Sequence, residues 1–396
     1  MAIVLGFEQY DMGILNAVLP QIIEAFSIRG EDSGTLLGTI RLGGFGAVLL
    51  VPLADRLGRR RIFLVTMVGM GLGEFLTAFS TSAFMFGALQ VVARCFLLAA
   101  LALGIVILVE ELPAAQRGAG IAFLGVLSGT GYGLAAMLYA AVDVVPGGWR
   151  TLYVIGSGPL FLVPFFRRAL PETHRFTDSE AAHAAQGSSL AGLWLAPVRE
   201  LLTRDPRRVV FIGFAGALAA CGTIAFFQYA SFHLATIHGW SPAGYAVLVG
   251  AGGLIGLAGG VFGGRLSDRL GRRTVGSVVY LLAPLGMALF YLGPTSLLIL
   301  TWGVALVFVI AGDVVLRAYF GELFPTSHRS TSLAWMLIVQ TVGWAGGLYV
   351  VDFLSGTVED LPAAVATVGG ACALAGLCLL ALPETARTEL DAEPSA

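Results

Sequence analysis

Long apolar segments, repeated along almost the whole chain, constrain its fold more than any other feature of the sequence. A helix rises 1.5 Å per residue, so about 20 apolar residues cross the roughly 30 Å hydrocarbon core of a bilayer. Breaks made of charged residues, glycine and proline separate twelve segments of this kind. They are 1–25, 35–54, 61–81, 84–109, 118–142, 149–166, 209–233, 241–264, 273–292, 295–320, 331–354 and 362–382. The sequence therefore predicts an all-α membrane protein with twelve transmembrane helices.

The charge content agrees with a chain whose solvent is lipid. Charged residues make up 12% of the chain and hydrophobic residues 57%, whereas soluble proteins carry roughly 25% charged residues. All 23 basic residues are arginine, and the net charge is −2. A chain of nearly zero net charge lacks the basic surface that binds a polyanion, so we expect no nucleic-acid partner.

From two further features we expect neither a cleaved leader nor a disulfide framework. Residues 1–25 contain Glu8 and Asp11 and lack a basic start, so they predict a spanning helix rather than a signal peptide. The four cysteines lie inside apolar segments, where a thiol packs as a small hydrophobic group.

The longest polar interval divides the apolar segments six and six. It runs over about 167–208 and contains seven arginines. We therefore expect a six-helix bundle at 1–170, a cytoplasmic linker at 171–208, a second bundle at 209–385 and a cytoplasmic tail at 386–396.

The arginines also predict the orientation, because positively charged loops stay in the cytoplasm. With the N-terminus inside, 18 of the 23 arginines are cytoplasmic. We expect an integral protein of the plasma membrane, which is the inner membrane in a bacterium, with both termini in the cytoplasm.

Three motifs recur in the same order at nearly one spacing. Asp55-Arg-Leu-Gly-Arg-Arg60 returns as 268–273, an offset of 213 residues. Glu111 and Arg117 return as Glu322 and Arg329, and Leu-Pro-Glu-Thr at 170–173 returns at 382–385. The chain is therefore a duplicated six-helix unit. Two parallel halves of this kind build transporters that open alternately to each side of the membrane.

The motifs resemble those of the major facilitator superfamily, and the resemblance covers essentially the whole chain. Gly264-Arg-Leu-Ser-Asp-Arg-Leu-Gly-Arg-Arg273 matches the signature of that superfamily at every position. The first copy has Val51 in place of the first glycine, so helix packing there is expected to be looser. The resemblance implies two pseudo-symmetric six-helix bundles with a substrate site between them.

Within the superfamily, the chain is most similar to the branch of sugar porters and organic-ion or aromatic-acid proton symporters. Tyr10-Asp11-Met-Gly13 resembles the Tyr-Asp-x-Gly pattern of that branch, and Glu8 with Asp11 resembles the paired acids of the aromatic-acid symporters. The paired glutamines of sugar porters are absent, since only Gln228-Tyr229 stands there. The segment 118–142 lacks the proline of the efflux antiporters but keeps part of their glycine spacing.

Ionisable residues within the apolar segments are functional candidates, because a charge at the bilayer centre costs at least about 2.5–3.5 kcal/mol. Glu8 and Asp11 are three residues apart and share one helix face. Arg94 lies at a similar depth. The resemblance implies that Asp11 pairs with Arg94 for proton coupling; the alternative is a permanently closed pair that only fixes helix packing. Glu8 is either a second proton carrier or a hydrogen-bonding group beside substrate.

Two other pairs admit two interpretations each. Arg41 and Glu74 fall at comparable depth, so they form either a structural salt bridge or, for Arg41, a fork that receives a substrate carboxylate. Asp313 and Arg317 are four residues apart on one helix, where they form either an intrahelical pair or a substrate contact.

Uncharged polar residues in the second half are candidate substrate contacts. Gln228, Tyr229 and Gln340 would leave hydrogen-bonding groups unmet if they faced lipid. A glutamine can equally bond a neighbouring helix, so packing is the alternative.

The repeated charged motifs predict a cytoplasmic gate of salt bridges that break and re-form between the bundles. Its candidate residues are Asp55, Arg56, Arg59, Arg60, Glu111, Arg117, Asp268, Arg269, Arg272, Arg273, Glu322 and Arg329. The alternative is that the arginines only set topology. Topology requires no acidic residues, which favours the gate.

These observations predict a secondary transporter rather than an enzyme. Without lysine the chain has no phosphate-binding Gly-Lys motif, and we find no catalytic triad or metal-ligand spacing. We expect a monomer without cofactor or metal that imports a small polar metabolite, first of all an organic acid, together with protons. The alternatives are a proton-antiporting exporter of drug-like compounds and a sugar:proton symporter.

Overall fold

The computed structural model describes residues 2–111, 129–170, 203, 205–324 and 329–386. Within these ranges the regular elements are helices, and no strand occurs. The chain forms two compact units. Unit 1 comprises Met1–Ile28, Thr39–Trp194 and Leu234–Ala246, and unit 2 comprises Arg29–Gly38, Leu195–His233 and Val247–Ala396. The linker expected at 171–208 lies outside the described residues, apart from 203 and 205–208.

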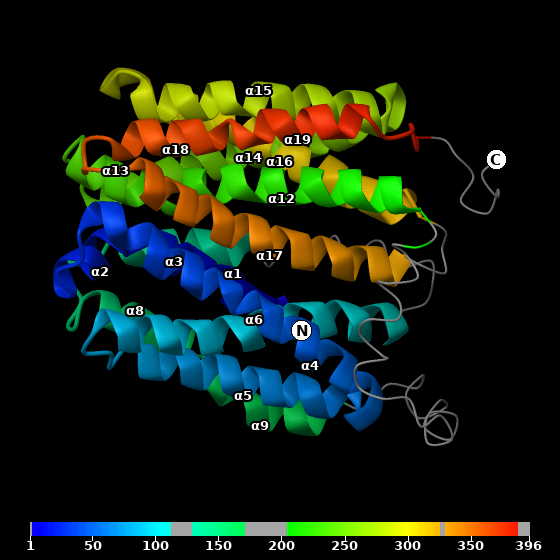
Figure 1. Cartoon of the computed structure of the whole chain (residues 1–396). Helices are drawn as coiled ribbons and strands as arrows, with labels where there is room; N and C mark the ends of the chain where they lie inside the picture. The colour runs from blue at the N-terminus through cyan, green and yellow to red at the C-terminus, as the bar shows by residue number, and fades with distance from the viewer. Residues whose placement is uncertain (1, 112–128, 171–202, 204, 325–328, 387–396) are drawn as a thin grey trace. The chain divides into compact units, whose positions relative to one another are not determined.

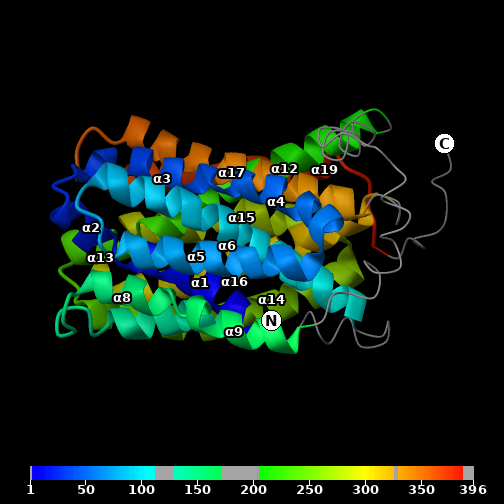
Figure 2. The same ribbon diagram turned by 90° about the horizontal axis from the view of Figure 1, so that it is seen from below.

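Unit 1 contains the helices of the first half of the chain (Figure 1). They are α1 (Ala2–Ala17), α2 (Leu19–Ala25), α3 (Ser33–Leu42), α4 (Gly44–Leu57), α5 (Arg59–Thr77), α6 (Ala83–Glu111), a helix at 129–139, α8 (Trp149–Gly156) and α9 (Pro159–Ala169). The first residues of α3 belong to unit 2. Helix α5 packs along α6 on one side and α9 on another, as the second view also shows (Figure 2).

Unit 2 contains the helices of the second half (Figure 1). They are α12 (Pro206–Gln228), α13 (Ala230–Thr236), α14 (Pro242–Leu270), α15 (Arg272–Leu292), α16 (Leu298–Glu322), α17 (Arg329–Leu354), α18 (Leu361–Gly369) and α19 (Ala371–Leu380). The end of α13 and the start of α14 are assigned to unit 1. Helix α12 packs on α17 and α19, and α15 packs on α16 and α19.

Several segments that the sequence analysis treats as single helices are broken in two. Breaks fall at Val18 before Pro20, at Gly158 before Pro159 and at Gly370. Proline lacks the N–H that would continue the helical hydrogen bonds, so a helix restarts there instead of running on. Proline and glycine breaks are tolerated in membrane helices when neighbouring helices satisfy the freed backbone groups.

Eight helices or helix pairs in the described part of the chain are long and apolar enough to cross a membrane. They begin at Ser33, Ala83, Pro206, Pro242, Arg272, Thr295, Trp335 and Leu361. The remaining expected segments also hold helices wherever the structure describes them. The all-helical prediction is therefore confirmed, and the count of twelve spans stays a prediction.

The repeated Asp-Arg-Leu-Gly-Arg-Arg motif forms the same turn in both units. Gly58 separates α4 from α5 with φ of 99°, and Gly271 separates α14 from α15 with φ of 108°. Side chains with a Cβ rarely adopt this conformation, so glycine is required at both junctions. The motif therefore sets where the following helix starts, and with it the position of the arginines.

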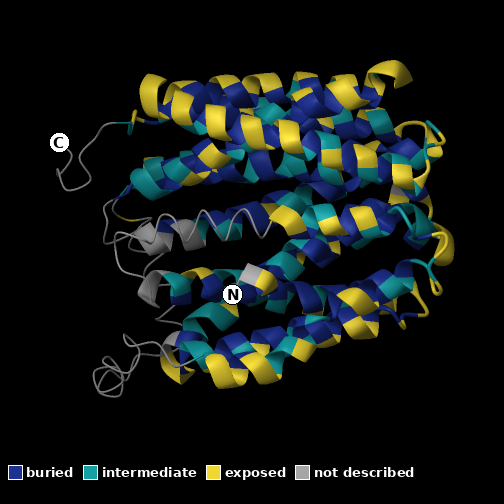
Figure 3. Ribbon diagram, turned by 180° about the vertical axis from the view of Figure 1, so that it is seen from behind, coloured by how far each residue is buried: buried dark blue, intermediate teal, exposed yellow. Residues whose placement is uncertain are grey.

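Both units bury apolar side chains between helices and expose others outward. In unit 1, Phe63, Met67 and Met70 of α5 pack on Leu97 of α6. In unit 2, α12 and α17 approach so closely that a Cβ at Gly343 would lie 2.1 Å from the carbonyl oxygen of Ala217. Large apolar side chains are nevertheless exposed, as the yellow stripes along the helices show (Figure 3). Such surfaces are stable where the solvent is lipid.

Candidate functional site

The described part of the chain contains five charged side chains that are buried, and all five lie in unit 1. They are Glu8, Asp11, Arg41, Glu74 and Arg94, each 1 or 2% exposed. They come from α1, α3, α5 and α6. Tertiary structure thus gathers residues that are up to 86 positions apart in the sequence. We refer to these five residues as the buried charge cluster.

Asp11 and Arg94 form the ion pair at the centre of the cluster. Oδ2 of Asp11 lies 3.0 Å from Nη2 of Arg94. The two atoms are not aligned for a hydrogen bond, and neither oxygen of Asp11 accepts one from a described residue. A carboxylate held by charge alone at a buried site is poorly stabilised. The two charged groups are therefore in contact, but no hydrogen bond joins them.

Arg41 lies beside Arg94. The guanidinium groups of both arginines contact Sδ of Met12. Nη2 of Arg41 also donates to Oδ1 of Asn16 at 3.3 Å, and Nδ2 of Asn16 donates to the hydroxyl of Tyr132. Arg41 is electrostatically coupled to Arg94, Asp11 and Glu8. Both guanidinium groups therefore approach the same thioether sulfur.

Glu74 contacts Gln90 and Asp11, and it forms no salt bridge with Arg41. Nε2 of Gln90 donates to Oε1 of Glu74 at 3.3 Å. Oε2 of Glu74 has no donor among the described residues, although its carboxyl interacts with that of Asp11 and with Arg94. The salt bridge considered for Arg41 and Glu74 is therefore not among the contacts of Glu74 in the described part of the chain. The reason is that helix rotation turns Glu74 of α5 toward α1 and α6.

Gly156 of α8 leaves room for the carboxyl group of Glu74. A Cβ at Gly156 would lie 3.1 Å from Oε2 of Glu74. The hydroxyl of Tyr153, one turn earlier, is buried and has no hydrogen-bond partner among the described residues. The side chain of Tyr10 is held nearby, since its hydroxyl donates to the carbonyl oxygen of Leu152 at 2.9 Å. The Glu74 end of the cluster is therefore polar and incompletely hydrogen-bonded.

Glu8 completes the cluster on α1. Its Oε2 accepts a hydrogen bond of 2.8 Å from Nε2 of Gln9. Three carboxyl groups thus share one buried region with two guanidinium groups. If all five are ionised, the region carries one negative charge, which is costly in a medium of low dielectric constant.

The predicted contacts of the second half lie in unit 2. Gln228, Tyr229 and Gln340 are all buried. The hydroxyl of Tyr229 accepts a hydrogen bond of 3.4 Å from the hydroxyl of Ser33. Asp313 and Arg317 form an intrahelical pair with an Oδ2–Nε distance of 2.7 Å, and their side chains are 43 and 59% exposed.

Three of the predicted gate residues of unit 2, Asp268, Arg272 and Glu322, form one network at the start of α15. Arg272 contacts Oδ1 of Asp268 at 2.6 Å and Oε1 of Glu322 at 3.0 Å. It also donates to the hydroxyl of Ser267 at 2.6 Å. The hydroxyl of Thr385 donates to Glu322 at 2.9 Å. Arg269 and Arg273 are exposed beside this network.

Glu384 of the repeated Pro-Glu-Thr motif caps the N-terminus of α15. Its carboxylate accepts hydrogen bonds from the backbone N–H groups of Arg272 at 2.6 Å and Arg273 at 3.2 Å. A carboxylate is favoured here because the first N–H groups of a helix have no helical acceptors and carry partial positive charge.

The gate residues predicted in unit 1 are only partly described. Arg56 is exposed, and Arg59 and Arg60 are partly buried at the start of α5. The side chains of Asp55, Glu111 and Arg329, and the whole of Arg117, lie outside the description. The gate as an assembly therefore stays a prediction.

Sequence reasoning missed two acidic contacts. It considered only Arg41 as a partner of Glu74, and it did not single out Asp352 on α17. The Asp352 carboxylate accepts hydrogen bonds of 2.9 Å from the backbone N–H groups of Gly34 and Thr35, and one from the Thr35 hydroxyl. Asp352 thus caps α3, which lacks an acidic residue in its own first turn. The absence of an acidic residue from the first turn of α3 is the one feature of the sequence that points to this contact.

Within the described residues, no group of three histidine, cysteine, aspartate or glutamate side chains is placed to hold a metal ion. The buried cluster contains two arginines, whose charge opposes a bound cation. The cluster is instead suited to proton exchange and to binding an anion.

Comparisons with known proteins agree with this architecture. The family model of the Major Facilitator Superfamily matches residues 1–347 and 233–395. The gallate transporter of Pseudomonas putida is 26% identical, with 95% of this chain and 88% of the relative covered. The 4-hydroxybenzoate transporter PcaK of Pseudomonas aeruginosa is 25% identical, with 91 and 88% covered.

A crystal structure of a D-xylose-proton symporter has a similar fold, with a TM-score of 0.75. It is 17% identical, and the alignment covers 97% of both chains. At this identity the likeness concerns the fold alone. The family match over essentially the whole chain, the all-helical fold and the apolar spans lead to one conclusion. This chain is a membrane transporter, not an enzyme, and it belongs to the Major Facilitator Superfamily.

Proposed function

We propose that this protein is a proton-coupled symporter that imports an aromatic carboxylic acid by alternating access. The observation that carries the proposal is the buried charge cluster, with three carboxyl groups against two guanidinium groups. The substrate class is supported by the relatives named for gallate and 4-hydroxybenzoate, which are both aromatic monocarboxylates.

The charge count supports binding of one proton. The cluster becomes neutral when a single proton joins one of its three carboxyl groups. Asp11 and Glu74 are the best candidates, because their carboxyl groups interact and both have oxygens without a donor. Two carboxyl groups in contact share a proton readily, since the hydrogen bond between them satisfies both.

Arg41 and Arg94 are candidates for binding the substrate carboxylate. A guanidinium group presents two parallel N–H donors that match the geometry of a carboxylate. When Asp11 is protonated, it no longer neutralises Arg94, and the freed charge attracts an anion. Proton and organic anion would therefore bind together, which is the requirement for symport. The hydroxyl of Tyr132 and the amide of Asn16 lie beside Arg41 to bond ring substituents.

The rest of the architecture follows the superfamily plan in this proposal. Twelve spans form two six-helix bundles, at 1–170 and 209–385, with both termini in the cytoplasm and a monomer as the working unit. Gln228, Tyr229, Gln340, Asp313 and Arg317 are the candidate contacts from the second half, and the repeated charged motifs form the gate. The Asp268–Arg272–Glu322 network supports this role for the second copy.

Uptake into proteoliposomes tests the function. Labelled 4-hydroxybenzoate should accumulate when the lumen is more alkaline than the medium and should not when the gradient is reversed. Accumulation under the reversed gradient would instead identify an exporter. Competition by unlabelled D-xylose, but not by gallate, would identify a sugar porter.

Asp11→Asn tests the coupling site. The variant should lose accumulation driven by the pH gradient but keep exchange of labelled for unlabelled substrate, because exchange needs no net proton movement. Glu24→Gln is the matched control, since Glu24 is an exposed acid on α2. Undiminished accumulation by Asp11→Asn would show that Asp11 does not couple the proton.

A further inference from the structure

A second polar site lies at the other end of unit 1, away from the buried charge cluster. A cavity of about 760 Å³ opens where α4 ends and α5 begins, beside α6 and α9. Four arginines line it, namely Arg56, Arg60, Arg61 and Arg167. The remaining lining is mainly apolar and comes from Leu57, Leu64, Val65, Val68, Phe96 and Val163.

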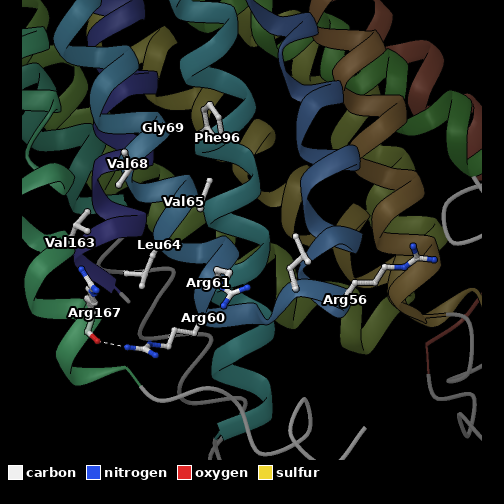
Figure 4. Close-up of a pocket in the computed structure, with 11 residues that line it drawn as sticks. Arg56, Arg60, Arg61, Leu64, Val65, Val68, Gly69, Phe96, Val163 and Arg167 are labelled. Atoms are coloured by element: carbon white, nitrogen blue, oxygen red, sulfur yellow. Dashed lines mark hydrogen bonds between the residues drawn. The ribbon is translucent and has the colours of Figure 1, made fainter. Parts of the chain in front are cut away.

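The cavity has two chemically different ends. The arginines gather at the end where α5 begins, and the apolar side chains continue along α5 toward Phe96 (Figure 4). Arg56 points away from the other three arginines (Figure 4). Arg60 donates a hydrogen bond to the carbonyl oxygen of Arg167, which joins α5 to the end of α9. One end therefore suits an anion and the other a hydrocarbon chain.

No acidic residue lines the cavity in the described part of the chain. Arg61 and Arg167 are exposed, and their side chains make no hydrogen bond or ion pair with a described residue. Like charges in one cavity repel each other, and the repulsion is strong beside an apolar wall. An anion bound among them would relieve this repulsion.

The surface around the cavity carries exposed apolar side chains. Val65 on α5 is 46% exposed, and Phe161 and Phe165 on α9 are 82 and 63% exposed. A water-soluble anion would leave the apolar end of the cavity unfilled. A molecule with an anionic headgroup and acyl chains fits both ends.

The internal repeat shows that this site is particular to unit 1. The positions that correspond to Arg61 and Arg167 in the second copy are Thr274 and Leu379. These two arginines are therefore not part of the duplicated motif. A bias of basic residues toward one membrane side explains positive charge, but it does not require a cavity with an apolar wall.

We propose that this cavity binds an anionic phospholipid. The phosphate lies among Arg60, Arg61 and Arg167, and the acyl chains lie along Val65, Val68 and Phe96. Basic pockets between transmembrane helices are suited to anionic lipid headgroups, because guanidinium groups pair with phosphate in a region of low dielectric constant. The headgroup would bridge the start of α5 and the end of α9.

Lipid binding to the full-length protein in detergent tests the proposal. The probes are phosphatidylglycerol, phosphatidylcholine with the same acyl chains, and inorganic phosphate. Native mass spectrometry should show one phosphatidylglycerol retained per chain under conditions that remove phosphatidylcholine. Phosphatidylglycerol should also raise the thermal unfolding midpoint in a saturable way.

The variant Arg61→Thr/Arg167→Leu installs the residues of the second copy. Each basic residue near an anionic lipid contributes about 1 kcal/mol, which is about fivefold in affinity. The double variant should therefore bind phosphatidylglycerol about 25-fold more weakly. Arg168→Leu is the matched control, because Arg168 is an exposed neighbour that does not line the cavity and corresponds to Leu380.

Three results would overturn the proposal. They are equal retention of phosphatidylcholine, equal stabilisation by inorganic phosphate, and an equal loss of affinity in Arg168→Leu. If the double variant does not fold, Arg61→Thr alone should weaken binding about fivefold. The preference of the unaltered protein among the three probes then tests the lipid proposal independently of any variant.

Discussion

The two units derive from the same repeated segments but place their charges in opposite ways. Unit 1 buries five charged side chains among its helices, whereas no charged side chain is buried in the described part of unit 2. The described charged side chains of unit 2 are instead partly buried or exposed, and those in the network around Arg272 lie at helix ends. The duplication therefore preserved the motifs at the ends of helices while the interiors diverged.

This difference indicates a division of labour. Charges at helix ends sit near water and cost little, so a structural or gating role is sufficient to explain them. Charges in the interior are costly, and an apolar replacement is often as stable or more stable. Retention of five such residues in one unit is best explained by a function that needs them. The following changes test that interpretation.

Arg94→Met is expected to have the largest effect. It leaves Asp11 buried without its cation, and loss of one partner of a buried pair destabilises proteins by about 3–5 kcal/mol. The thermal unfolding midpoint of the purified variant in detergent should fall sharply. The double variant Arg94→Met/Asp11→Leu should regain most of this stability without regaining transport.

The matched change in unit 2 is Arg317→Met. Its pair with Asp313 is close at 2.7 Å but largely exposed. Exposed pairs contribute about 0–1 kcal/mol, so the midpoint should hardly change. Equal falls for Arg94→Met and Arg317→Met would contradict the contrast between the two interiors.

Glu74→Gln should remove the proton dependence of transport with little loss of stability. Glutamine preserves the shape of the side chain but leaves two carboxyl groups against two guanidinium groups, so the cluster is neutral without a proton. With one proton per monoanion, a gradient of one pH unit sustains an accumulation ratio of about tenfold, since one unit corresponds to 1.36 kcal/mol. The accumulation ratio of the Glu74→Gln variant should stay near unity in the proteoliposome assay.

The control for Glu74→Gln comes from unit 2. Glu359→Gln also removes one carboxylate, but it does so at an exposed position outside the candidate site. This variant should keep pH-driven accumulation. If Glu74→Gln still reaches a tenfold accumulation ratio, the coupled proton is assigned to Asp11 or Glu8 instead.

Glu384→Ala is expected to have the smallest effect. It removes the carboxylate that caps α15, and the loss of a helix cap costs about 1 kcal/mol. The residue of the first copy that corresponds to Glu384 is Glu172, which lies outside the described residues. Glu172→Ala should therefore lower the unfolding midpoint by a similar amount. If the unfolding midpoint falls in Glu384→Ala but not in Glu172→Ala, the two units differ at their helix ends as well.

The sequence predicted several features because each depends on local or additive properties. Apolar segment length gave the helical membrane fold, and the repeated Asp-Arg-Leu-Gly-Arg-Arg motif located the turns at Gly58 and Gly271. The closeness of Asp11 and Arg94 followed from the resemblance to proton-coupled transporters, and the 3.0 Å contact agrees with it. Their roles in transport stay predictions.

Other features could not be read from the sequence. Helical periodicity gives the direction of Glu74 relative to its own helix, but not the residue of another helix that it meets. Its true neighbours, Gln90 and Asp11, depend on how α5 is rotated against α1 and α6. The breaks before Pro159 and at Gly370 likewise depend on whether neighbouring helices satisfy the freed backbone groups.

By itself the sequence determined the solvent, the helical class and the duplication, because these depend on how many apolar residues follow one another and on which motifs recur. Only the tertiary structure decided which ionisable groups share one buried region and which arginines line one cavity. The interaction of two charges falls with their separation and with the dielectric constant around them. Both quantities are set by the packing of whole helices, and residues far apart in the sequence contribute equally to them.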